Sequence, residues 1–262
     1  MYLASLTWKK LEEKITEETV ALIPLGSVEQ HGPLAPLGTD YFIPEEFAKR
    51  VEAAYPDKIM VLPTMPYGVC PYHASFPGTI DMGIEILSEV MTRIAMSLMD
   101  TGIKKMIFLN GHGGNGPSLD KAALAVYKRG GLAAIVDWWT LAGELNAKWA
   151  GGHGAGQETS VMMALKPEWV NMKDFFPANI HHVSDSLQNT HISIVTFEKG
   201  SVRIIRDVKD VTSSGAYGGT DAPEDANREW GEEILNGVTE YLIRFIAEYF
   251  KVSFTRKKLD NT

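Results

Sequence analysis

Four short apolar runs, separated by segments with helical spacing, constrain the fold of this chain more than any other feature. The runs predict strands that are buried on both faces, and they cover residues 19–25, 59–62, 105–110 and 132–138. Apolar residues recur at helical spacing over residues 43–54, 84–101 and 117–128. Strands that are apolar throughout and alternate with helices are typical of a mainly parallel sheet covered on both faces. We therefore predict an α/β fold.

The rest of the chain is expected to complete one domain spanning residues 1–262, because no repeat or long linker interrupts it. Pro44 is placed in the first turn of the helix at 43–54, where its missing N–H costs nothing. Thr7 is a candidate cap for a helix at 8–14. The other predicted elements are helices at 158–165 and 222–250, a hairpin of strands 191–197 and 201–206 with its turn at Lys199-Gly200, a glycine-rich loop at 213–221, and a polar tail at 251–262 that frays.

Composition excludes several classes of partner. The formal net charge of -8 disfavours nucleic acid and anionic membrane surfaces. No basic, apolar leader is evident, and no apolar run approaches the ~20 residues needed to span a bilayer. The single cysteine, Cys70, cannot form an intrachain disulfide and fits a reducing cytoplasm. We expect a soluble cytoplasmic protein in which Cys70 is a buried thiol rather than a nucleophile.

The loop after the first predicted strand carries Glu29, His31 and Asp40 among glycines and prolines. Side chains at alternate positions lie on the same side of an extended backbone, so Glu29 and His31 can converge on one point. Glycine and proline fix sharp turns, which can return Asp40 to that point. The loop therefore predicts up to three ligands of a metal site.

Two further segments carry histidine or carboxylate among glycines, Asn110-Gly111-His112-Gly113-Gly114-Asn115 and His153-Gly154-Ala155-Gly156-Gln157-Glu158. The first joins a strand to a helix, as a phosphate-binding loop does, but it lacks both the Rossmann glycine spacing and the Walker Lys-Ser/Thr pair. In parallel sheets, ligands bind beyond the carboxyl ends of the strands. Three such segments together therefore favour one site built from histidines and carboxylates.

The order and spacing of these segments, including Gly26-Ser27-Val28-Glu29-Gln30-His31-Gly32-Pro33 and Gly38-Thr39-Asp40, resemble the creatininase (creatinine amidohydrolase) family through residue 165. The resemblance implies a three-layer α/β/α fold and a metal-dependent hydrolase of small molecules. It implies two divalent ions, Zn and/or Mn with Fe as a further possibility, and a homo-oligomer, with hexamers common.

The resemblance also implies a role for each site residue. Glu29 and His112 would hold one ion, His31 and Glu158 the other, and Asp40 would bridge the two. Two such ions can share a hydroxide that attacks an amide carbonyl. His153 is the candidate general acid that protonates the leaving group, and the alternative is a loop histidine bonded to backbone.

The substrate is open at this point. Creatininase has Tyr and Glu where this chain has Gly113 and Gly114, which argues against creatinine itself. Hydrolysis of an amide or cyclic amide is the first reading. The alternatives are ring opening of a cyclic polyol ketone such as 3-dehydro-scyllo-inosose, deformylation of a formamide, and a metal-binding scaffold without catalysis.

Residues of the pocket wall are expected in the stretch 72–79 and among the tryptophans. His73, Ser75, Gly113 and Trp149 are the predicted substrate contacts. Trp138 and Trp139, at the end of a predicted strand, are equally well explained as core or subunit contacts. The remaining histidines match no ligand signature, and surface or interface positions are expected for His181, His182 and His191.

Overall fold

The computed structural model describes residues 1–218 and 222–254 and is built on a four-stranded sheet in the order β2-β1-β3-β4. All three neighbouring pairs are parallel. The strands are β1 (Val20–Leu25), β2 (Ile59–Val61), β3 (Lys105–Asn110) and β4 (Leu132–Asp137). The prediction of an α/β fold with a parallel sheet is confirmed.

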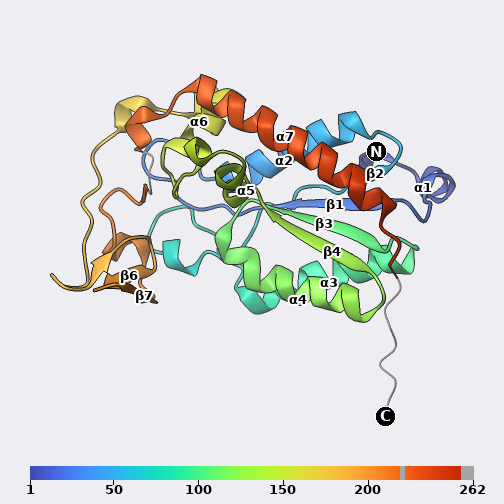
Figure 1. The fold of residues 1–262 in the computed structure, drawn as a ribbon, viewed down its shortest axis with the longest axis horizontal. Helices are drawn as coiled ribbons and strands as arrows, with labels where there is room; N and C mark the ends of the chain where they lie inside the picture. Colours follow the sequence, from blue (N-terminus) through green and yellow to red (C-terminus); the bar gives the residue numbers. More distant parts are fainter. Residues whose placement is uncertain (219–221, 255–262) are drawn as a thin grey trace, which may run out of the picture.

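Helices cover both faces of this sheet and make three layers (Figure 1). One face carries α2 (Thr39–Ala54), α5 (Trp138–Leu145), α6 (Gly156–Leu165) and α7 (Arg228–Lys251). The other face carries α3 (Ile84–Asp100) and α4 (Gly116–Lys128). This is the layered arrangement that the resemblance implied.

Alternation along the strands explains why both layers pack. In β1, Val20 and Leu22 join the core with α2 and α7, whereas Ala21, Ile23 and Leu25 join the core with α3 and α4. Every residue of β1 and of β3 is buried. A continuous apolar run is therefore what a strand between two helical layers requires.

Two helices begin four or more residues away from the predicted start. Helix α2 begins at Thr39, so Pro44 lies inside it rather than in its first turn. Pro44 has no N–H to donate to the carbonyl of Asp40, one turn earlier, and the carbonyl of Asp40 lies instead against the strand ends described below. Helix α7 begins at Arg228, because Pro223 starts a separate 3-10 turn and the side chain of Asn227 caps the helix by accepting from Trp230 N–H at 2.9 Å.

The strand predicted at 132–138 ends one residue early, and a helix that the prediction missed follows it at once. Trp138, the first residue of α5, is buried in the core beside Phe47, with ring centroids 5.9 Å apart. The following Trp139 is only partly buried. The run of apolar residues across this junction is equally compatible with a buried helix, which is why periodicity alone misplaced the boundary.

The predicted hairpin is present with shorter strands, β6 (Ile194–Phe197) and β7 (Gly200–Arg203), and an additional strand β5 (Gln188–Asn189) completes a small antiparallel sheet. Helix α1 (Trp8–Lys14) is capped by Thr7 as predicted. The 3-10 helices are Leu3–Ser5, Pro71–His73, Gly113–Asn115, Ala147–Trp149, Pro167–Trp169, Met172–Asp174, Val208–Asp210 and Pro223–Asp225.

Parts of two predictions lie outside the described residues: positions 219–221 of the glycine-rich loop and positions 255–262 of the polar tail. Among the helices of the described ranges, none combines the length and the apolar character that a bilayer crossing needs.

Candidate metal centre

The carboxyl ends of β1, β3 and β4 lie level at one edge of the sheet. Leu25 pairs with Asn110, and Asn110 pairs with Asp137. The strand order reverses between β1 and β3, because β2 lies on one side of β1 and β3 on the other. The loops that carry Glu29 and His112 leave the sheet at this reversal, the usual place for a ligand in an open parallel sheet.

Asp40 reaches this edge because the first turn of α2 sits directly on two strand ends. A Cβ atom built on Gly26 would lie 2.1 Å from the carbonyl oxygen of Asp40. One built on Gly111 would lie within hard contact of the same oxygen and 2.9 Å from Pro44 Cγ. Glycine at both positions therefore allows the close approach of α2 that brings Asp40 beside the two loops.

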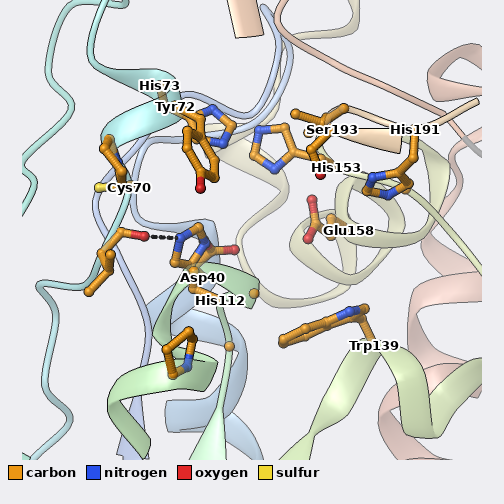
Figure 2. Close-up of a pocket in the computed structure, with 18 of the residues that line it drawn as sticks. Asp40, Cys70, Tyr72, His73, His112, Trp139, His153, Glu158, His191 and Ser193 are labelled. Atoms are coloured by element: carbon orange, nitrogen blue, oxygen red, sulfur yellow. Dashed lines mark hydrogen bonds and ion pairs between the residues drawn. The ribbon is translucent and has the colours of Figure 1, made fainter. Parts of the chain in front are cut away.

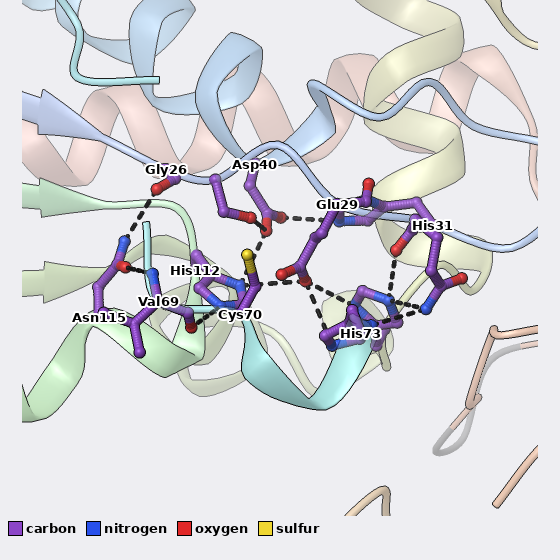
Figure 3. A network of polar contacts seen from close by, with 12 residues as sticks. Gly26, Glu29, His31, Asp40, Val69, Cys70, His73, His112 and Asn115 are labelled. Carbon is purple, nitrogen blue, oxygen red and sulfur yellow. Dashed lines mark hydrogen bonds and ion pairs between the residues drawn. The ribbon is translucent and has the colours of Figure 1, made fainter. Parts of the chain in front are cut away.

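Glu29, Asp40 and His112 form a first group of converging acceptor atoms, which we call cluster A (Figure 3). His112 Nδ1 lies 2.9 Å from Asp40 Oδ2 and 3.2 Å from Glu29 Oε1. The other ring nitrogen of His112, Nε2, lies 2.8 Å from the carbonyl oxygen of Val69, which only accepts. In the neutral ring the hydrogen is therefore on Nε2, and Nδ1 turns a lone pair toward the two carboxylates.

His31, Asp40 and Glu158 form a second group, cluster B. His31 Nε2 lies 2.8 Å from Asp40 Oδ1 and 3.7 Å from Glu158 Oε2. His31 Nδ1 donates to the carbonyl oxygen of Glu29 at 3.1 Å, so in the neutral ring Nε2 also turns a lone pair toward carboxylates. The two oxygens of Asp40 thus face different histidines, as in a carboxylate that bridges two ions.

Acceptor atoms that converge in a buried place repel one another unless a cation or a proton lies among them. Both oxygens of Glu29 are buried without a hydrogen-bond partner in the described part of the chain. Ligand atoms of Glu29, His31 and Asp40 lie within 4.8 Å of one another, as do those of His31, His153 and Glu158. Imidazole nitrogen and carboxylate oxygen together suit Zn and Mn, so the donor set fits a pair of divalent ions.

The ionisation of these groups shows the same demand for positive charge. Burial by itself lowers the pKa of His31, but the charges of Asp40 and Glu158 outweigh burial and raise that pKa to about 10. Burial also opposes the ionisation of His112, and the charges of Glu29 and Asp40 raise its pKa well above the usual value. Burial, aided by the charge of Asp40, raises the pKa of Glu158 to about 7. Without metal, these groups therefore bind protons at the places where divalent ions would fit.

Gln30, between two of the predicted ligands, organises two more histidines. Its Nε2 lies 2.9 Å from the carbonyl oxygen of Gly215 and 2.8 Å from His73 Nδ1. His153 Nε2 lies 2.8 Å from the backbone carbonyl oxygen of Gln30 and donates to it. The two amide hydrogens of Gln30 then go to Gly215 and His73, which places the hydrogen of His73 on Nε2.

The remaining nitrogens of these two rings face Glu29. His73 Nε2 lies 3.4 Å and His153 Nδ1 lies 3.7 Å from Glu29 Oε1. Burial is the main reason that the pKa of each ring falls below its usual value, and for His153 the neighbouring His73 and His31 lower it further. His153 is therefore a neutral ring that lines the cavity, with the lone pair of its Nδ1 beside the carboxylate of Glu29.

A cavity of about 370 Å³ opens beside the two clusters. Figure 2 shows Tyr72, His73 and His153 along one side, Trp139 on the opposite side, and His191 and Ser193 beyond Glu158. The predicted site residues that line this cavity are Asp40, His73, His112, Gly113, His153 and Glu158. Glu29 and His31 lie behind this surface with no exposed area.

Two predicted substrate contacts lie elsewhere. Ser75 is exposed, and its backbone N–H donates to the Asp207 carboxylate at 3.2 Å on the outer side of the loop. Trp149 packs on α7 so closely that a Cβ atom on Gly237 would overlap its ring. Neither residue is part of the cavity lining. Both were expected from the resemblance of their segments to the family, which does not fix where each side chain points.

Other residues line the cavity without having been predicted there, among them His191, expected at the surface or an interface, Ser193 and Arg203. Trp139, for which an aromatic pocket wall and a core or subunit contact were both open, belongs to the lining as well. The small sheet folds back over the site, which no local pattern indicates. Cys70 also borders the cavity, but it is buried, its thiol donates to the carbonyl of Ile80, and burial raises its pKa. The prediction of a buried cysteine is confirmed.

The chain matches the family described as Creatininase: Creatinine amidohydrolase over residues 4–246. It is 25% identical to the 3-dehydro-scyllo-inosose hydrolase of Thermotoga maritima over 95% of this chain and 85% of that protein. It is 34% identical to the mycofactocin precursor peptide peptidase of Mycobacterium ulcerans over 57% of this chain and 59% of that protein.

Solved structures of creatininases share the fold. A mutant creatininase described as Zn-Zn type superposes with a TM-score of 0.72 at 23% identity, covering 96% of this chain and 98% of that one. A structure described as creatininase Mn gives a TM-score of 0.73 at 22% identity and covers 96% of this chain and 99% of that one.

Proposed function

Because the chain belongs to the creatininase family, we propose that this hydrolase works with two divalent ions, Zn or Mn, held at clusters A and B. The observation that carries the proposal is the convergence of acceptor atoms in both clusters, with Asp40 contributing one oxygen to each. Relatives of the same fold that are described with Zn and with Mn support the choice of ions.

Each ion has a distinct set of residues. Glu29 and His112 would hold the ion in cluster A, His31 and Glu158 would hold the ion in cluster B, and Asp40 would touch both. The bound ions supply Lewis acidity and acidify water, which is what hydrolysis of a carbonyl compound needs. The backbone carbonyls behind His112 and His31 fix the ring orientation of both ligands before any ion binds.

His153 is the residue proposed to move the proton. Its Nε2–H is held by the carbonyl of Gln30, its Nδ1 lies 3.7 Å from Glu29 Oε1, and the residue lines the cavity. A neutral ring in this position first accepts a proton at Nδ1 from the attacking water and then delivers it to the leaving atom. The sequence suggested a general acid that protonates the leaving group. In this proposal His153 first takes up the proton that it later donates.

We place the bond cleaved in the amide class, because a carrier at Nδ1 suits a leaving nitrogen that must be protonated. Ring opening of a cyclic polyol ketone is the second candidate, favoured by the similarity to the inosose hydrolase over 95% of the chain. Creatinine, formamides, short peptides and dehydro-inososes, each tested with Mn or Zn added, separate the two. Turnover of the dehydro-inosose alone would reject the amide class.

The metal centre is tested by the content of bound ion in an Asp40→Asn variant. The substitution keeps the size of the side chain and removes the bridging charge, so we expect about two ions per wild-type chain and at most one in the variant. The matched control is Asp120→Asn, an exposed carboxylate on α4, which should retain the wild-type content.

Metal content is measured by plasma mass spectrometry after equilibrium dialysis against Mn or Zn. Wild-type protein purified without chelator that binds no ion would contradict the proposal. Equal contents in wild type and Asp40→Asn would contradict the bridging role alone.

A further inference from the structure

Arg203 is a lining residue of the cavity beside the metal clusters, and its side chain is exposed to solvent. It is the one lysine or arginine among the lining residues that the structure describes. It ends β7, where it pairs with Ile194 of β6, and the next residue, Ile204, donates its N–H to the carbonyl of Ser193 at 2.9 Å. The position of Arg203 at the cavity is therefore set by backbone pairing.

The guanidinium of Arg203 has no hydrogen bond and no ion pair with any described residue. The contrast with Arg206, three residues later, is informative. Arg206 donates to Asn189 Oδ1 at 2.6 Å and to the carbonyl of His181 at 3.2 Å. One arginine of this segment thus holds the small sheet together, and the other lines the cavity with no carboxylate partner among the described residues.

Neutral donors surround this cation. Ser193 and His191 line the same wall, and burial lowers the pKa of His191, so its ring is neutral. His191 also packs beside the Tyr217 ring, with centroids 5.8 Å apart. The carboxylates of the lining, Asp40 and Glu158, belong to the metal clusters. Arg203 is therefore the one charged group that the hairpin itself contributes to the described lining, where the Ser193 hydroxyl and the His191 ring are neutral hydrogen-bonding groups.

We propose that this wall is a subsite for an anionic oxygen group of the substrate, a carboxylate or a phosphate, with Arg203 as its charged partner. The inference rests on the proposed function, because it places the reacting carbonyl at the metal clusters and the anionic group at the hairpin. A guanidinium presents a planar set of donors that matches both kinds of anion. The substrate class is then an amide or ketone that carries a negative charge away from its reacting carbonyl.

Hydroxamates provide a probe, because they bind divalent ions through the hydroxamate and can carry a second group on a tether. Neutral propionohydroxamate is compared with the monohydroxamates of malonic, succinic and glutaric acids and with a tethered phosphonate. Dissociation constants are measured by calorimetry on Mn- or Zn-loaded protein. The proteins are wild type, Arg203→Ala and Lys199→Ala, which removes the same charge from the hairpin turn outside the cavity lining.

At one tether length, we expect the anionic compound to bind wild type about tenfold more tightly than the neutral one, as for a charge-assisted hydrogen-bonded pair. Arg203→Ala should lose this gain and keep the affinity for propionohydroxamate, which also shows that the variant is folded. Lys199→Ala should keep both. Whichever anion, carboxylate or phosphonate, gives the larger gain in affinity over the neutral compound identifies the anionic group that the subsite prefers.

Two results would overturn the inference while the proposed function stands: no gain at any tether length, or a gain that survives in Arg203→Ala. Failure of every hydroxamate to bind the metal-loaded protein would instead overturn the proposed metal centre, and the anion subsite with it.

Discussion

The chemistry of the site depends on which nitrogen of each histidine carries its hydrogen. Backbone carbonyls of Glu29 and Val69 take the hydrogens of His31 and His112 on the side away from the clusters. The backbone carbonyl of Gln30 takes the hydrogen of His153 in the same way, whereas the side-chain amide of Gln30 donates to His73 Nδ1 and so leaves the hydrogen of His73 on Nε2. Partners of this kind fix both the tautomer and the orientation of a ligand ring.

Replacing Gln30 with alanine tests this positioning role. His73 and His153 lose the amide that separates and orients them, so we expect kcat on an identified substrate to fall about 10- to 100-fold. The content of bound metal should stay unchanged, because the side-chain amide of Gln30 contacts none of the ligand atoms of clusters A and B. Histidine ¹⁵N NMR should show a changed tautomer distribution, and Gln188→Ala, in the exposed part of β5, should show none of these effects. Unchanged ¹⁵N shifts in Gln30→Ala would contradict the role.

Residue spacing predicted that Glu29, His31 and Asp40 meet at one place, because an extended segment followed by a fixed turn leaves few alternatives. It did not predict the role of Gln30, whose partners His73 and Gly215 lie 43 and 185 residues away. Contacts of this length depend on how loops pack, and no local periodicity carries that information.

At the scale of elements, the loop after β3 is shaped by contacts that leave no room for side chains. Asn115 joins the site loops by donating to the carbonyl of Gly26 at 3.0 Å and accepting from Val69 N–H at 3.0 Å. A Cβ atom on Gly114 would be in hard contact with the Val69 carbonyl and 2.6 Å from His112 Nε2. Gly113 meets only Trp139, at 3.8 Å. The two neighbouring glycines therefore have different roles.

The pair Gly114→Ala and Gly113→Ala separates these roles. A methyl group at 114 must push Val69 away from His112, so we expect a loss of about 1–3 kcal/mol in the free energy of unfolding and weaker metal binding. A methyl group at 113 enters open space and should change the free energy of unfolding by less than about 0.5 kcal/mol. Urea denaturation and metal titration measure both quantities. Equal stability of the two variants would show that the loop can move aside.

Elements between the layers were predictable, and elements near the site were less so. The strands β1 and β3 are buried on both faces, so their apolar runs coincide with their bounds. Helix α2 starts four residues before the predicted position because tertiary contact at the strand ends, not local propensity, sets its first turn. Tertiary packing also decides the position of Trp138, which is buried in the core as the first residue of α5 and not as the last residue of β4.

For the whole molecule, the clusters link stability to metal and to pH. Three carboxylates and two histidines are buried at one edge of the sheet that both helical layers share. Without ions, the raised pKa values of His31 and Glu158, about 10 and about 7, mean that protons compensate the buried charge. Ions and protons therefore compete for the same places, and binding of ions releases protons.

The sign of the pH dependence follows from these shifts. The pKa of His31 is raised, so its stabilisation is present below about 6.5, the unfolded value, and is lost as the pH rises toward about 10. Glu158 acts in the same direction, because its raised pKa makes ionisation near pH 7 unfavourable to the metal-free fold. Bound ions remove both penalties. The gap in Tm between metal-loaded and chelator-treated protein should therefore widen from pH 6.5 to pH 8.5.

At pH 7.5, chelation should lower Tm by about 10–20 °C, since ligand at about 100 times its Kd contributes about 2.7 kcal/mol at each of the two sites and a domain of this size shifts by about 2–4 °C per kcal/mol. Differential scanning calorimetry at three pH values measures the gap directly. In Asp40→Asn, which removes one carboxylate from both clusters, the gap should shrink at every pH. A gap that narrows as the pH rises would mean that protons and ions do not compete at this edge, and that the buried carboxylates are stabilised by something other than a cation.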